Sequence, residues 1–208
     1  MLQNTARTAP RTKSDRMSYD RDVAYEILDQ ALVCHVGFVT DGTPVVIPTI
    51  HWRVGDHLYF HGSHGSRMAK TMAAGQDLCV TVTLLDGLVM ARSAFNHSMN
   101  FRSVVLFGQA EEISDFAEKS AIFDALMEKV APGRLPHLRP MHDKEVNATK
   151  LLSLTIDEGS VKSRKGPPGD PEEDRSWPVW AGVLPLSQTA GEPVVDVHVP
   201  PGVTAGKP

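Results

Sequence analysis

Residues 32–61 contain the pattern that decides the fold. They read LVCHVGFVT (32–40), DG (41–42), PVVIPTIHW (44–52), VGD (54–56) and HLYFH (57–61). Apolar and β-branched residues fill each long run, and Asp and Gly occupy the short connections, as in β-hairpins. The stretch therefore predicts three consecutive antiparallel strands.

The rest of the chain extends this pattern. Further strands are predicted near 78–84 and 88–95, joined by Asp86-Gly87, and near 102–113 and 151–156. Three helices are predicted: one capped by Ser18 or Asp20, with Val23, Ala24, Ile27, Leu28 and Ala31 on one face, one from Ser66 to Gly75, and one from Ser114 to Pro132-Gly133. Six or seven strands with short turns favour a mainly β fold, a split antiparallel barrel with peripheral helices, over a parallel doubly wound sheet.

The chain divides into one domain and two tails by composition. Residues 1–17 are polar and basic and are expected to be disordered, residues 18–186 form the domain, and residues 187–208 are rich in Pro and Gly and are expected to be loose. Residues 165–173, KGPPGDPEE, are expected to form a loop.

Composition narrows the classes of function. With 21 basic and 25 acidic side chains the net charge is -4, which disfavours a general nucleic-acid binder. No apolar run approaches the ~20 residues of a membrane-spanning helix, and no apolar segment follows the basic N-terminus as in a signal peptide. Cys34 and Cys79 lie in apolar runs, which favours free thiols and a cytoplasmic location over a disulfide framework.

Residues 58–70, LYFHGSHGSRMAK, have the features of an anion-binding turn. A strand ends, Gly62 and Gly65 allow the backbone to approach a ligand, and a helix begins at Ser66 with its free N–H groups. Arg67 can hold a phosphate through two parallel donors. No Walker GxxxxGK[ST] motif is present, and an ordinary capped helix with a solvated arginine explains the same residues about equally well.

This segment resembles the FMN-phosphate turn of the pyridoxamine 5'-phosphate oxidase-like family. Gly65, Ser66 and Arg67 match that turn, whereas Met68 stands where the oxidases usually have lysine, a loss for which Lys70 could compensate. The runs LLDGLVMARSAFNHSMNFRSVVLFG (84–108) and PVWAGVLPL (178–186) are similar to a bacterial branch of oxidase-like and nitroimidazole-resistance proteins.

The resemblance implies a flavin site at a homodimer interface. The strand 46–51 would contact the ring, with Val46 in place of the oxidases' arginine, and Ser103 would reach the flavin across the interface. Trp180 could stack on the flavin, pack in the core or contact the partner. The cofactor-binding residues expected from the resemblance are Val46, Ile47, Pro48, Thr49, Ile50, His51, His61, Gly62, Ser66, Arg67, Met68, Lys70, Ser103 and Trp180.

Histidines supply the candidates for proton transfer. Four of them, at 51, 57, 61 and 64, lie within fourteen residues, but no Cys or carboxylate stands at a zinc-ligand spacing beside them, so no metal site is expected. His61, at the end of a strand, and His97, in the rim segment NHSMN (96–100), are the candidate proton donors near the flavin.

The resulting expectation is an FMN-dependent oxidoreductase, with FAD possible, acting on an unidentified small molecule such as a nitroaromatic compound. The C-terminal Arg-Leu-His motif of the vitamin B6 enzyme is absent, which disfavours that activity. Two alternatives stay open: a flavin-binding protein without turnover, and a haem-binding relative with a histidine axial ligand.

Overall fold

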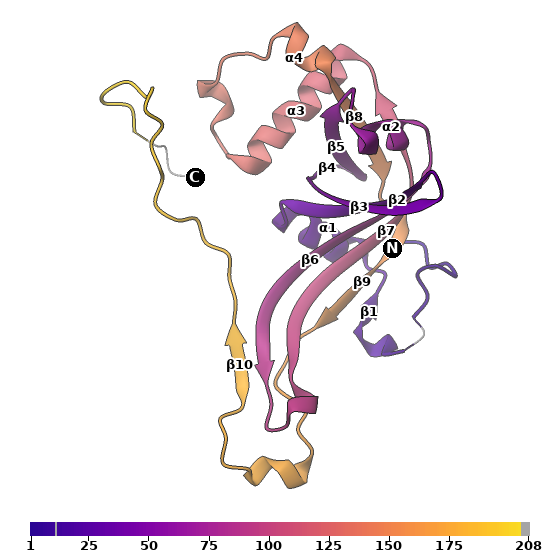
Figure 1. Cartoon of the computed structure of the whole chain (residues 1–208), viewed down its shortest axis with the longest axis vertical. Helices are drawn as coiled ribbons and strands as arrows, with labels where there is room; N and C mark the ends of the chain where they lie inside the picture. Colours follow the sequence, from indigo (N-terminus) through magenta and orange to yellow (C-terminus); the bar gives the residue numbers. More distant parts are fainter. Residues whose placement is uncertain (11, 205–208) are drawn as a thin grey trace.

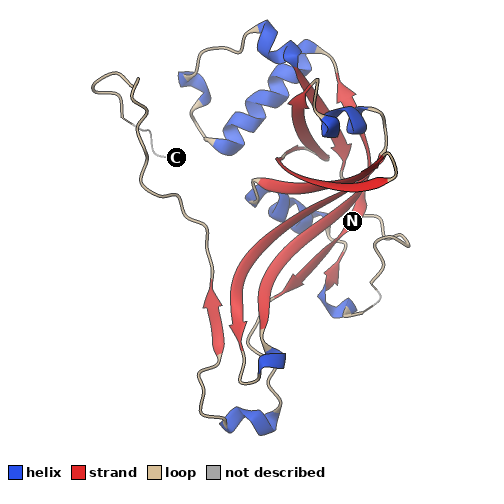
Figure 2. Ribbon diagram, in the orientation of Figure 1, coloured by secondary structure: helices blue, strands red, loops and turns tan. Residues whose placement is uncertain are grey.

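The computed structural model describes residues 1–10 and 12–204 and is built on one antiparallel sheet of ten strands (Figures 1 and 2). Along its main path the strand order is β3-β2-β6-β7-β8-β5-β4, with β9 and β10 attached to β7 and β6, and β1 to β9. The strands are β1 (Met17–Ser18), β2 (Val33–Thr40), β3 (Thr43–Ile50), β4 (Trp52–Val54), β5 (His57–Ser63), β6 (Asp77–Met90), β7 (Ser98–Ile113), β8 (Thr149–Thr155), β9 (Glu158–Arg164) and β10 (Gly182–Pro185). The predicted mainly β, split-barrel fold is confirmed.

Four α-helices of the described residues lie around the sheet: α1 (Arg21–Gln30), α2 (Arg67–Ala73), α3 (Phe116–Val130) and α4 (Asp143–Ala148). Of the two predicted caps of α1, Asp20 is the one used, and its side chain accepts from the amide of Asp22. The predicted cap of α3, Ser114, is wrong by one residue, because the carboxylate of Asp115 accepts from the Glu118 amide. α4 was not predicted from the sequence.

Two groups of buried side chains stabilise the fold. The larger fills the barrel beneath α1 and α2 and includes Leu28, Phe60, Met72 and Leu106. The smaller lies between the sheet and α3, where Trp52, Tyr59, Phe123, Leu126 and Leu151 pack together. The strand β5 separates them, since Leu58 and Phe60 belong to the first group and Tyr59 to the second.

The strands β6 and β7 continue beyond the barrel as a projecting arm (Figure 1). The term arm is used below for three parts of the chain: residues 84–101, the strand β10 that pairs with β6, and the connecting segment 165–181. The prediction of a turn at Asp86-Gly87 is wrong: β6 is continuous, and the pair marks a register shift between Leu85 and Gly87. Asp86 is held in the sheet by Arg102 of β7, and the chain reverses instead at residues 91–97.

The N-terminal residues pack against the sheet, in contrast to the disorder expected for 1–17. Leu2 is only 4% exposed, Gln3 bridges to Glu158, and the Arg7 guanidinium pairs with Glu158 and lies 5.0 Å from the ring centroid of Phe107. A short apolar anchor and an ion pair therefore order a segment whose composition is that of a tail. Residues 187–204 contain no helix or strand.

No helix in the described part of the chain is long and apolar enough to cross a membrane.

Candidate functional site

The strand β3 offers an open main-chain edge. It pairs with β2 on one side and ends the strand order of the sheet on the other. Thr40 and Thr43 flank the two-residue turn and form a hydrogen-bonded pair. Hydrogen-bonded and non-hydrogen-bonded pairs alternate along the two strands from there. Val46, Pro48 and Ile50 therefore occupy non-hydrogen-bonded positions. The N–H groups of Val46 and Ile50 and the C=O groups of all three residues therefore point away from β2, where the polar edge of a flavin ring could form hydrogen bonds with them.

The side chains of the predicted segment 46–51 alternate between two environments. Val46 is 65% exposed and Pro48 is exposed, whereas Ile47 packs against the barrel core and Ile50 against the cluster under α3. Thr49 is half-buried. Only the outward-facing half of the strand can meet a ligand with its side chains.

His51 does not face the open edge, because its ring is fully buried beneath α1. Its Nε2 lies 3.0 Å from the main-chain oxygen of Leu28 and donates to it, and its buried Nδ1 has no partner. Burial, with the nearby charge of Lys129, lowers the pKa of His51 to about 4. A contact of the His51 ring with a surface-bound flavin is therefore excluded in this conformation.

Gly62 and Ser66 shape a tight turn between β5 and α2. A Cβ at Gly62 would lie 3.1 Å from the Cβ of Ala69 and 3.4 Å from the Ser66 Oγ. The Ser66 hydroxyl caps α2 by accepting from the Ala69 amide. The absence of a side chain at Gly62 thus lets the first turn of the helix approach the end of β5.

Arg67 and Lys70 are exposed on α2, and neither takes part in an ion pair among the described residues. Both cations are therefore available to an anion. Met68 lies between them but points inward, at 4% exposure in the barrel core. The expected contact of the Met68 side chain with the cofactor is corrected accordingly: it packs the helix onto the sheet.

His61 lies at the boundary between a buried and an open environment. Its ring centroid is 5.9 Å from that of Trp52 and 6.2 Å from that of Phe123, and its buried Nδ1 has no hydrogen-bond partner. Burial lowers its pKa below the ordinary value, which favours a neutral imidazole. Because the Nδ1 atom is enclosed by protein, only the exposed part of this half-buried ring can meet a ligand.

The other histidines of the cluster do not join His61. His64 Nε2 lies 2.8 Å from the Asn147 main-chain oxygen, and His57 is exposed beside Tyr59. Within residues 1–10 and 12–204, no three His, Cys, Asp or Glu side chains form a group that could hold a metal ion.

Three predicted residues lie on other strands. Ser103 is half-buried on β7, where its hydroxyl donates to the Lys162 main-chain oxygen at 3.1 Å. Trp180 and His97 belong to the arm and are exposed. In Figure 1 the arm points away from α2, so one chain does not bring Trp180 or His97 to the Ser66–Arg67 turn.

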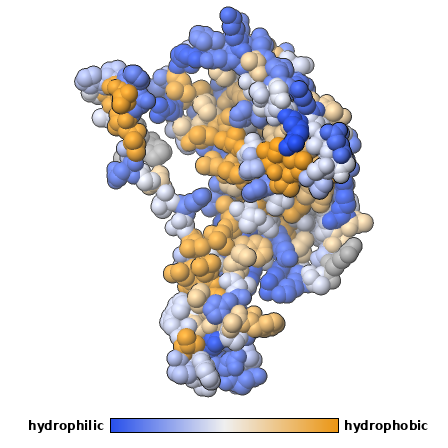
Figure 3. Space-filling view, viewed as in Figure 1, coloured by the Kyte–Doolittle hydropathy of each residue, from blue (hydrophilic) through white to orange (hydrophobic). Residues whose placement is uncertain are grey.

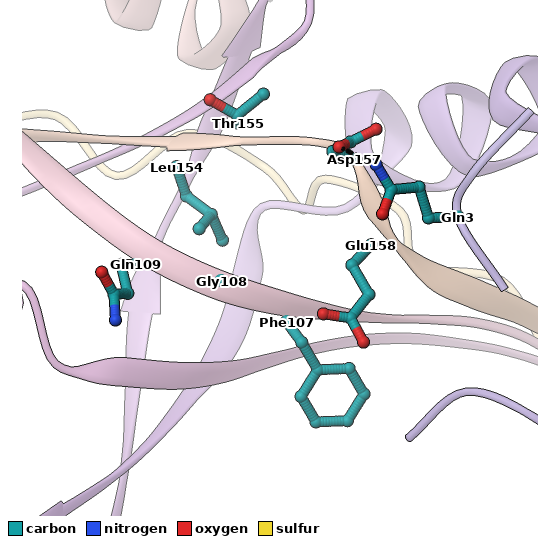
Figure 4. A pocket seen from close by; sticks show the side chains of 8 residues that line it. All are labelled: Gln3, Phe107, Gly108, Gln109, Leu154, Thr155, Asp157 and Glu158. Carbon is teal, nitrogen blue, oxygen red and sulfur yellow. Dashed lines mark hydrogen bonds between the residues drawn. The ribbon is translucent and has the colours of Figure 1, made fainter. Parts of the chain in front are cut away.

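A cleft of about 400 Å³ lies elsewhere, between the N-terminal segment and the strands β7 and β8 (Figure 4). The residues that line it are Gln3, Phe107, Gly108, Gln109, Leu154, Thr155, Asp157 and Glu158. None of the residues predicted to bind the cofactor is among them. Its two carboxylates, Asp157 and Glu158, pair with Arg21 and Arg7.

The comparisons with known proteins agree with this architecture. The family model described as pyridoxamine 5'-phosphate oxidase matches residues 20–163. The chain belongs to this family. Among curated proteins, none matches the sequence.

Two solved structures are similar to the chain over almost its whole length. The flavocytochrome Anf3 from Azotobacter vinelandii is 44% identical, with a TM-score of 0.90 over 97% of this chain and 94% of that one. The FAD and heme binding protein from Mycobacterium smegmatis is 39% identical, with a TM-score of 0.88 over 92% and 94%. A 5-nitroimidazole antibiotic resistance protein from Bacteroides thetaiotaomicron, 24% identical with a TM-score of 0.58 over 70% and 86%, shares the fold.

Sequence reasoning missed the second apolar surface of the molecule, which the arm carries. The strand β10 and the long reach of β6 escaped prediction because their pairing partners are distant in sequence. The available signal was the run LLDGLVM (84–90), whose apolar residues continue on both sides of Asp86-Gly87.

Proposed function

We propose that this member of the family is a flavin- and haem-binding redox protein, with FAD as its flavin. One observation carries the proposal: the chain matches the FAD and heme binding protein at 39% identity across 92% of its length. The similarity to a flavocytochrome at 44% identity supports it independently. Since both alignments include the arm as well as the barrel, the proposal concerns the whole chain.

The barrel carries groups suited to the flavin. Arg67 and Lys70 would neutralise a phosphate beside the Ser66 turn, where exposed cations have no competing carboxylate partner. The free main-chain groups of Val46, Pro48 and Ile50 would bind the polar edge of the ring. An ordinary capped helix could carry the same cations, but this barrel also has an open strand edge that can bind a ring.

A bound flavin and haem would supply the electron-transfer chemistry, and the chain would supply position and electrostatics. His61 would hold a neutral imidazole against the ligand, because its burial disfavours the protonated form. Trp52 and Phe123 pack against the His61 ring and restrict its orientation. A homodimer and a small-molecule electron donor or acceptor are part of the proposal.

The choice of FAD revises the expectation of FMN. The 39% identical protein is described as binding FAD. The expectation of FMN came from the resemblance to the more distant oxidases. Reduction of nitroaromatic compounds is not part of the proposal. The nitroimidazole-resistance protein is 24% identical to this chain, and that similarity shows only a shared fold.

The test is to purify the protein with riboflavin and haem precursors supplied during expression. Cofactors released by heat are then separated by chromatography against FAD, FMN and haem standards. We expect FAD and haem at about one each per chain, and anaerobic NADH or dithionite to bleach the flavin and shift the haem bands. Protein that binds neither cofactor after reconstitution would refute the proposal, and FMN in place of FAD would correct it.

A further inference from the structure

A row of apolar side chains crosses the arm. Leu184 of β10, Leu88 of β6 and Met99 of β7 are successive cross-strand partners, so their side chains point to the same face of the sheet. They are 52%, 39% and 51% exposed. Large apolar side chains in neighbouring positions on an open sheet face indicate a binding surface rather than a solvated one.

The same face continues toward the tip of the arm. Met90 pairs with Gly182, two residues further along both strands, and therefore lies on the same side as Leu88 and Leu184. The Trp180 ring lies over Gly182, where a Cβ would come within 3.0 Å of the indole. We call these side chains, with Leu88, Met99 and Leu184, the shelf. Orange side chains along the arm in Figure 3 mark its apolar character.

His97 stands at the end of this shelf, two residues before Met99. Its Nδ1 lies 2.9 Å from the main-chain oxygen of Ser93 and donates to it, which fixes the ring and leaves Nε2 free as an acceptor. The side chain is exposed, and the neighbouring Phe95 is 94% exposed. An imidazole anchored through Nδ1–H to a carbonyl is the usual arrangement of a metal-ligating histidine.

An ion pair secures the loop that carries His97. Asp170 is buried and accepts from both the main-chain amide of Arg92, at 3.1 Å, and its guanidinium, at 2.9 Å. The loop 91–97 is therefore tied to the segment 165–181 on the other side of the arm. A fixed ring beside a fixed apolar shelf requires little reordering when a ligand binds.

We propose that His97 Nε2 would bind the iron of a haem group and that the shelf would contact its porphyrin. This inference rests on the proposed function. An imidazole with a free nitrogen can bind haem iron and a broad apolar surface can cover the porphyrin, and the arm carries both. The barrel, with its free strand edge and cations, is left to the flavin.

Three histidines of the barrel fit the role less well. His51 is fully buried and its Nε2 is engaged with Leu28. His64 uses Nε2 on the Asn147 carbonyl. The buried Nδ1 of His61 has no partner that would fix a ligating tautomer.

The test compares haem spectra of the full-length wild type, His97→Ala, His61→Ala and, as a matched exposed control, His137→Ala. Each protein is titrated with hemin, and the Soret band and the electron paramagnetic resonance of the ferric state are recorded together with flavin content. We expect His97→Ala to weaken hemin binding by more than the roughly 10–100-fold typical of losing an outer-shell partner, with flavin content unchanged. His137→Ala should match the wild type. In His97→Gly, added imidazole should restore the wild-type Soret position, which a merely structural role of His97 would not produce.

The assignment of His97 as the ligand would be overturned if His97→Ala kept the wild-type spectrum, or if only His61→Ala lost it. Either result would leave the proposal of haem binding itself in place. A wild type that gives no Soret shift with hemin would instead refute the haem part of the proposed function. The two failures are thus distinguishable in one set of spectra.

Discussion

Arg102 and Asp86 form a bidentate ion pair between β7 and β6, with Nε 3.0 Å from Oδ2 and Nη2 2.7 Å from Oδ1. The pair sits at the register shift of β6, where the barrel gives way to the arm. Arg102 also donates to the Gln30 side chain at 2.8 Å, at the end of α1. One guanidinium therefore connects the arm, the sheet and a helix.

We predict that Arg102→Met loosens the arm without unfolding the barrel. A half-exposed bidentate pair contributes on the order of 1 kcal/mol, and its loss leaves the register shift unsupported. Hydrogen exchange of the amides of residues 87–99 should accelerate, while those of β2 and β5 keep their protection. Lys150→Met, which breaks the ion pair with Glu112 at the barrel, is the control and should leave exchange in the arm unchanged.

Arg67→Ala should weaken flavin binding by roughly 1.5–3 kcal/mol, the scale of one lost charged hydrogen bond. The physical reason is the removal of an unpaired guanidinium beside the Ser66 turn, and the readout is quenching of flavin fluorescence during a titration of the apoprotein. Arg134→Ala removes an equally exposed arginine from the loop after α3 and should bind like the wild type. Equal affinities for all three proteins would exclude Arg67 from the site.

Gly62→Ala should displace the first turn of α2. The new Cβ would stand 3.1 Å from the Ala69 Cβ, and such overpacking costs about 1–3 kcal/mol in stability. Gly65→Ala is the matched control three residues away: its Cβ would meet only the Ser63 Oγ, at 3.9 Å. Urea unfolding should separate the two variants, and a Gly62→Ala protein as stable as Gly65→Ala would show that the turn is not tightly packed.

Two identical dipeptides show which part of the fold could be predicted from the sequence. Asp41-Gly42 forms the expected hairpin turn, with φ of 49° and 72°, because local backbone conformation decides the outcome there. Asp86-Gly87 was predicted to turn as well, but lies within β6, because Arg102, 16 residues away, holds the Asp86 carboxylate. A contact of this kind has no local signature, and the arm was missed for that reason.

The candidate site shows the same division. The Ser66 cap follows from residue types in one short segment and was expected. Gly62 was expected to admit a ligand, and in the structure it admits the first turn of α2. The direction in which His51 points depends on where α1 packs, since the Leu28 carbonyl receives its ring. The family resemblance implied a contact with the flavin, and tertiary packing places the ring in the core.

His51 also provides a prediction about pH. Its folded-state pKa of about 4 lies below the unfolded value near 6.5, so the unfolded chain takes up a proton first as the pH falls. The stability that the neutral ring contributes is fully present above pH 6.5 and is lost progressively down to about pH 4. We expect a loss on the order of 1–3 kcal/mol over this window, because protonation would place an N–H at Nδ1, which has no acceptor.

His51→Gln isolates this contribution, since its amide can still donate to the Leu28 carbonyl but does not titrate. The free energy of unfolding in urea should be measured for both proteins at pH 7, 5.5 and 4.5. Carboxylates that titrate in the same range affect both proteins alike and cancel in the difference. The wild type should lose stability relative to His51→Gln as the pH falls. A difference that stays constant from pH 7 to 4.5 would mean that the His51 ring already has a proton acceptor, or water, at Nδ1 in solution.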